Sequence, residues 1–158
     1  MIEVLNKKIL AIAEKSKSTT ENSVTFSLKN LNNLFNIRIQ NVFDCIILVD
    51  EEEVVLSSEQ FEKVIKRNQD KTGYEAANNE LRIIDYSKSL LTEEEQYLIG
   101  KILIENLDNR ISGKVVYYFG FNQGILTLRF HKFREEDGFW TNENVEEYNE
   151  PLGYFISK

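Results

Sequence analysis

The chain has 158 residues, of which 42% are hydrophobic, 11% aromatic and 28% charged. This length and composition are typical of one folded domain spanning residues 1–158, and they exclude a disordered or fibrous protein. The net charge of -7 excludes a dedicated binder of duplex DNA or of an anionic membrane, because either function needs a basic surface.

The first part of the chain predicts a helix followed by a meander of short strands. Apolar residues recur at helical spacing over 2–16. The apolar segments that follow either alternate with polar residues or are rich in β-branched residues, and both patterns favour strands. The predicted strands of the meander are 24–28, 35–39, 42–49 and 54–56.

Two capping boxes predict two further helices. In a capping box, two side chains three residues apart satisfy backbone N–H groups at the start of a helix. Ser57 and Gln60 have this spacing, and the helix that they begin ends near Asn68. Thr92 and Glu95 have it too, and the helical spacing continues from there to residue 108.

The rest of the chain predicts loops and strands. Residues 69–79 contain few large apolar side chains and predict mainly loop, and 81–86 predict an edge strand. Two β-prone runs, 115–121 and 125–133, are joined by Asn-Gln-Gly and predict a hairpin, because glycine can adopt the left-handed conformation of a short turn. A last strand is predicted at 152–156.

These elements predict an α+β fold. We expect an antiparallel sheet, made from the meander and the C-terminal hairpin, with the helices 2–16 and 93–108 packed on one face. No stretch approaches the roughly 18 apolar residues of a membrane span. Charged residues interrupt the apolar pattern of the N-terminal region, which therefore lacks the h-region of a signal peptide. The single cysteine cannot form an intramolecular disulfide and is typical of a reducing cytosol, so we expect a cytoplasmic protein.

The sequence contains no clear catalytic signature. His131 is the only histidine, and strand alternation places it opposite Leu128 and Phe130, on the wetter face of its strand. Cys45 is the only cysteine and lies in an apolar strand without a basic neighbour, which predicts a buried structural thiol. An enzyme that uses His131 with a nearby carboxylate is the alternative interpretation.

Cofactor and metal sites are not predicted either. The acidic clusters 50–53 and 135–137 lack the ligand spacing of an EF-hand, and neither glycine of the hairpin region opens a helix. We therefore expect a protein that is not an enzyme and has no cofactor and no metal.

The region around the hairpin's second strand could also bind single-stranded nucleic acid. Arg129, Phe130, Lys132 and Phe133 interleave basic and aromatic side chains, as binders of single strands do. The adjacent acids at 135–137 would repel a phosphate backbone, so we expect these acids to neutralise the basic strand instead.

Negative charge is concentrated near the C-terminus. Residues 1–134 contain 18 basic and 19 acidic residues, whereas 135–157 contain seven acidic residues and no basic one. Acidic side chains steer a basic partner by long-range attraction, and Trp and Tyr often anchor protein interfaces. The predicted partner-binding residues are Glu135, Glu136, Asp137, Trp140, Glu143, Glu146, Glu147 and Tyr148.

The same region carries a family resemblance. The hairpin runs into Leu128-Arg129-Phe130-His131, an acidic turn precedes Phe139-Trp140, and Tyr148 and Pro151 precede the last apolar run. In these features, residues 116–156 resemble small immunity proteins of bacterial polymorphic and contact-dependent toxin systems. The resemblance implies a cytosolic, non-enzymatic inhibitor that binds and neutralises a toxin, often a nuclease.

The sequence therefore predicts a protein inhibitor whose acidic C-terminal segment binds a basic toxin or nuclease domain. A phage-encoded inhibitor of a bacterial defence nuclease, resembling an anti-CRISPR that mimics nucleic acid, has the same physical basis with a different partner. The single-strand binding module is the alternative from a different class.

Overall fold

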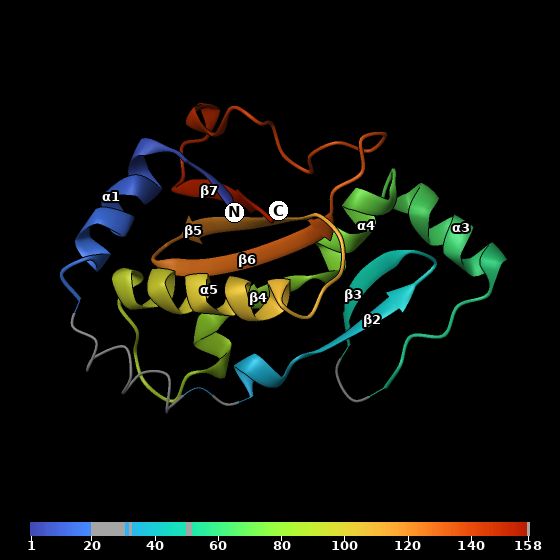
Figure 1. The fold of residues 1–158 in the computed structure, drawn as a ribbon, viewed down its shortest axis with the longest axis horizontal. Coiled ribbons are helices and arrows are strands. Elements are labelled where there is room, and N and C mark those ends of the chain that lie inside the picture. The colour runs from blue at the N-terminus through green and yellow to red at the C-terminus, as the bar shows by residue number, and fades with distance from the viewer. Residues whose placement is uncertain (20–30, 32, 50–51, 158) are drawn as a thin grey trace.

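The computed structural model describes residues 1–19, 31, 33–49 and 52–157. Within these residues the chain forms an α+β fold (Figure 1). The strands are β1 (Ile2–Leu5), β2 (Arg38–Val42), β3 (Cys45–Val49), β4 (Glu80–Arg82), β5 (Val115–Asn122), β6 (Ile125–Lys132) and β7 (Leu152–Ile156). The helices are α1 (Lys7–Ser16), α3 (Ser58–Arg67), α4 (Lys71–Asn78) and α5 (Glu93–Asp108), with 3-10 turns η1 (Leu34–Asn36), η2 (Ile83–Tyr86) and η3 (Val145–Glu147).

The larger sheet of the described residues is antiparallel and has the strand order β1-β7-β5-β6-β4. The hairpin strands β5 and β6 form its centre, with Tyr118 opposite both Arg129 on β6 and Tyr154 on β7. The first and last strands, β1 and β7, are neighbours at one edge (Figure 1). Strands β2 and β3 pair only with each other, as a separate two-stranded sheet.

One face of the larger sheet is covered by helices. Helix α5 buries Ile99, Leu103 and Leu107 against sheet residues that include Phe119 and Phe130. Helix α1 packs against α5 and adds its own apolar stripe to this core. The prediction of an α+β fold with these two helices on one face of an antiparallel sheet is confirmed.

The opposite face of the larger sheet is covered by a long connection instead of a helix. Residues 133–151 run from β6 to β7 across this face (Figure 1). Val145 is buried there together with Tyr118 and Tyr154 of the sheet, and Phe133 and Phe139 pack against this cluster. The sheet is therefore buried on both faces.

The capped helices and the hairpin agree with their sequence predictions. Both capping boxes are present, at Ser57 and at Thr92. The hairpin turns at Gln123 and Gly124, which both have positive φ, and the last strand forms as β7.

The N-terminal prediction is wrong at its start. Residues 2–5 form β1 instead of the first turn of a helix, because β7 supplies a strand partner from the other end of the chain. The Asn6 side chain then accepts a hydrogen bond from the Ile9 N–H and so begins α1. Ile2, which a helix would bury, is 60% exposed.

The meander forms in part. The predicted strand 42–49 is interrupted by a turn at Phe43 and Asp44, which both have positive φ. The observed strands of this region are therefore 38–42 and 45–49. The run 54–56 forms no strand, and the predicted strand 24–28 lies outside the described residues. The β2–β3 pair does not extend the larger sheet, because α4 lies against the edge of β3 that would have to join it.

The loop predicted at 69–79 is also wrong. These residues form α4, which Asp70 caps by accepting the Gly73 N–H at 2.6 Å. The predicted edge strand is shortened to β4, and the chain continues from it as η2. No described helix is long and apolar enough to cross a membrane.

Gly100 permits the close approach of α5 to the sheet. A Cβ atom at this position would lie 2.6 Å from the Phe119 ring and 3.0 Å from Leu126. We therefore expect Gly100→Ala to lower the free energy of unfolding by about 1–3 kcal/mol through overpacking, although alanine is the better helix former. Urea denaturation will measure this change, and Glu105→Ala on the exposed face of α5 should change stability by less than about 0.5 kcal/mol. Equal effects would contradict the packing argument.

Candidate functional site

The acidic segment, residues 135–150, is held firmly on the sheet. Asn6 donates a hydrogen bond from Nδ2 to the Glu150 carbonyl at 2.8 Å, and Val145 fills the apolar cluster below. Within the segment, Asn142 and Asn144 donate side-chain hydrogen bonds to Glu147, at 2.6 and 3.0 Å. These bonds fix the loop before any partner binds.

The acidic side chains point outward, with one exception. Asp137 is half-buried, and its Oδ2 is enclosed without a hydrogen-bond partner. Glu146 and Glu147 accept bonds from the chain itself, the former from the Lys7 N–H at 3.2 Å. The exposed acidic residues of the segment are Glu135, Glu136, Glu143, Glu146, Glu147 and Glu150. Six of the seven acidic residues of the segment are thus accessible to a partner.

The two predicted aromatic anchors differ in accessibility. Trp140 is 40% exposed and lies with its edge toward Tyr118, at 5.6 Å between ring centroids. Its indole also lies 5.2 Å from the guanidinium carbon of Arg129, a cation–π geometry. Tyr148 is half-buried, and its hydroxyl accepts the Asn142 N–H. Trp140 is therefore the accessible aromatic, whereas Tyr148 supports the loop.

The expectation that His131 lies on a wet face is wrong, because the connection 133–151 covers that face. The imidazole is fully buried and its Nδ1 lies 2.7 Å from the Lys132 carbonyl, which can only accept, so Nδ1 carries the proton. Nε2 then accepts a hydrogen bond from the Tyr118 hydroxyl at 3.1 Å, and that hydroxyl accepts one from the backbone N–H of Trp140. Burial lowers the pKa of His131 to about 4. A neutral histidine thus secures the acidic segment to β6.

The basic and aromatic residues of β6 do not gather into one platform. Phe130 is buried on the helix-covered face, against Tyr117. Arg129 pairs with Glu80, and Lys132 pairs with Asp44 at 2.8 Å. The prediction that the acids at 135–137 neutralise this strand is therefore corrected, since the neutralising carboxylates come from distant parts of the chain.

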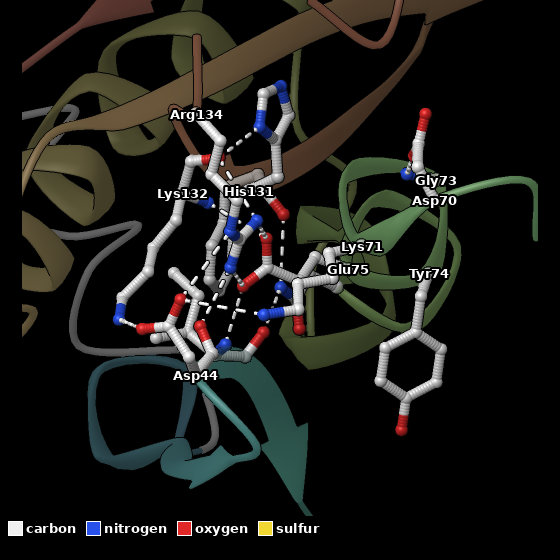
Figure 2. Close-up of polar contacts among 12 residues, drawn as sticks. Asp44, Asp70, Lys71, Gly73, Tyr74, Glu75, His131, Lys132 and Arg134 are labelled. Carbon is white, nitrogen blue, oxygen red and sulfur yellow. Dashed lines mark hydrogen bonds and ion pairs between the residues drawn. The ribbon is translucent and has the colours of Figure 1, made fainter. Parts of the chain in front are cut away.

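A buried ion pair lies between α4 and β6 (Figure 2). Arg134 donates from Nη1 to Glu75 Oε2 at 2.7 Å, and the backbone N–H groups of Ile46 and Lys132 donate to the same carboxylate. Burial raises the pKa of Glu75, and these donors act in the opposite direction. Burial also disfavours the charged guanidinium, but Glu75 outweighs this effect and the pKa of Arg134 is raised.

Asn79, one helical turn after Glu75, completes this joint between the two sheets. Its Nδ2 donates to the carbonyls of Ile46 at 2.8 Å and Phe130 at 3.0 Å, and its Oδ1 accepts the Leu48 N–H. The side chains of Glu75 in α4 and of Asn79 at its C-terminal end thus bridge β3 and β6, which are not paired with each other. The sequence did not predict this joint, because residues 69–79 contain few large apolar side chains and predict mainly loop. Asp70, a residue type preferred at helix N-caps, was the available signal.

Cys45 is buried beside this joint, as the sequence predicted. Burial, assisted by the nearby charge of Glu75, raises the pKa of the thiol to about 12. Such a thiol is a poor nucleophile and a poor metal ligand. Among the described residues, no group of three or more His, Cys, Asp or Glu side chains could hold a metal ion.

Comparisons with known proteins identify a family but no activity. Residues 4–158 match the family described as the uncharacterized protein PM0498 family. The chain belongs to this family. The match covers β2 to β7, the buried joint and the acidic segment. No curated protein and no solved structure matches the chain.

Proposed function

We propose that this protein is a non-enzymatic inhibitor, in the manner of an immunity protein, that binds and neutralises a basic toxin or nuclease domain through its acidic segment. The observation that carries this proposal is the exposure of six carboxylates, together with Trp140, on a segment that is held on the sheet. Because this surface is already held in place, little conformational entropy is lost in ordering it when a partner binds. The acidic side chains also raise the rate of encounter with a basic protein.

The buried histidine supports an inhibitor over an enzyme. A general base needs access to substrate and a pKa near the working pH, whereas His131 is enclosed, with both ring nitrogens hydrogen-bonded. The dispersal of Arg129, Phe130 and Lys132 likewise gives no stacking surface for nucleic acid. An inhibitor of a bacterial defence nuclease would use the same acidic surface, and the captured partner distinguishes the two.

Charge reversal tests the proposal. We expect Glu135→Lys, Glu136→Lys, Glu143→Lys and Glu150→Lys together to slow association with the partner at least about tenfold and to weaken its salt dependence. Within the described part of the chain, the hydrogen bonds that hold the segment use other side chains, such as Asn142, Asn144 and Glu147, so the loop should keep its shape. The partner is first captured from a lysate of the source organism with the tagged wild-type protein, and the kinetics are then measured by surface plasmon resonance.

A matched control changes the net charge by the same amount as the test variant. The variant with Glu14, Glu52, Glu62 and Glu105 changed to Lys alters the same number of exposed carboxylates outside the segment. It should retain fast association and should still block the partner's toxic or nuclease activity. Equal slowing by the two variants would mean that net charge, not this surface, controls binding, and capture of nucleic acid alone would overturn the proposal.

A further inference from the structure

A polar hollow lies between the α3–α4 turn and the aromatic part of the acidic segment. Its volume is about 440 Å³, and its walls include Arg67, Asp70 and Thr72 on one side and Phe139 and Trp140 on the other. These two parts of the chain are far apart in sequence, so folding alone creates the hollow. It adjoins the surface to which the proposed function assigns the partner.

Thr72 is the first sign that the hollow binds a ligand. The residue is 2% exposed, and its Oγ1 is buried with no hydrogen-bond partner. An unpaired buried hydroxyl is unfavourable, and valine would fill the same volume without that cost. Thr72 lines the hollow, and a ligand group that reached the covered Oγ1 and bonded to it would remove the penalty.

The other walls favour a guanidinium group. Asp70 is fixed in place because its Oδ1 accepts the Gly73 N–H, so an acidic side chain has a set position in the wall of the hollow. Trp140 offers an indole ring, and the Arg129 guanidinium already lies against that ring. A planar cation that donates several hydrogen bonds and stacks on aromatic rings suits a carboxylate, a hydroxyl and an indole together.

We propose that this hollow receives an arginine side chain of the partner protein. The proposal rests on the proposed function in one respect, namely that the occupant belongs to a basic protein drawn to the acidic segment. Arg67 is the only basic residue among the described residues that line the hollow, and it is exposed. It repels a cationic occupant and would attract an anionic one, so its removal reveals the charge of the occupant.

The only tryptophan of the chain reports on the hollow directly. In a titration with N-acetyl-arginine amide, we expect a saturable change in Trp140 fluorescence in the millimolar range. The matched citrulline amide, which has nearly the same shape and no charge, should bind at least fivefold more weakly. Equal responses to both compounds, or no saturable response to the arginine compound, would overturn the proposal.

Three variants give the sign of each wall's contribution. Thr72→Val should raise the urea midpoint of the free protein yet weaken arginine amide binding at least threefold, a combination that a purely structural threonine would not show. Asp70→Asn keeps the helix cap and should also weaken binding, whereas Arg67→Gln should strengthen it. Opposite signs for the last two variants would indicate an anion and overturn the proposal.

The proposed function and this inference fail separately. If arginine amide binds with the expected variant pattern but no basic protein is captured, the inhibitor proposal fails and the guanidinium site stands. If a basic partner binds and the charge-reversal variant releases it, yet the hollow variants leave its affinity unchanged, only the arginine proposal fails.

Discussion

Arg134→Met is expected to lower the free energy of unfolding by about 3–5 kcal/mol, the largest single effect that we predict. The substitution leaves Glu75 buried without its cationic partner, and an uncompensated buried charge costs far more than an intact pair contributes. Because a domain of this size is stable by about 5–15 kcal/mol, the loss would lower the melting temperature by about 10 °C or more. Urea denaturation at neutral pH, followed by circular dichroism, will measure it.

Two further variants separate the ion pair from the loss of arginine packing. Adding Glu75→Gln to Arg134→Met removes the stranded charge and should recover part of the stability, since glutamine can still accept a backbone N–H. Arg82→Met breaks an exposed ion pair with Asp85 and should change stability by less than about 1 kcal/mol. If the double variant is less stable than Arg134→Met, the buried-charge explanation is wrong.

The second large effect is a loss of stability in mild acid that depends on His131. Its pKa in the folded protein is about 4, below its ordinary value of 6.5, so the unfolded chain binds the proton more tightly. The contribution is fully present above pH 6.5 and is lost as the pH falls toward 4. The loss at pH 4 is on the order of 3 kcal/mol, because the unfolded chain takes up a proton that the buried imidazole of the folded protein binds much more weakly.

His131→Gln removes this titration while retaining a neutral hydrogen-bonding side chain. The variant should be less stable than the wild type at pH 7, and the difference in unfolding free energy should shrink by most of that amount at pH 4. Glu75, whose pKa burial raises, contributes pH dependence of the opposite sign, and the difference between the two proteins cancels it. A difference that stays constant between pH 7 and pH 4 would contradict the assigned role of His131.

Local sequence signals predicted the elements that local physics determines. The capping boxes and the hairpin turn are specified by residues a few positions apart, and they formed as expected. β1 depends instead on pairing with β7 at the far end of the chain, and no local pattern reveals that partner. α4 contains Gly73 and few large apolar residues, and its stability comes from Glu75 and Asn79 bonding to two different sheets.

The candidate site was predictable in composition but not in arrangement. Counting charges located the acidic segment, and six of its seven acidic residues are exposed. The burial of His131 depends on the 133–151 connection folding back over its strand, although alternation assigned the correct strand face. The hollow beside Trp140 depends on the wrongly predicted α4, so no reading of the acidic segment alone would have located it.

The turn between β2 and β3 has a consequence for the order of folding. Phe43 and Asp44 both adopt positive φ without glycine, and this strained turn is held by Lys132 and Arg134 from the far end of the chain. The hairpin therefore has little tendency to form before α4 and β6 are in place. We infer that β2–β3 joins late in folding and opens first in partial unfolding, which would expose the Cys45 thiol while the larger sheet persists.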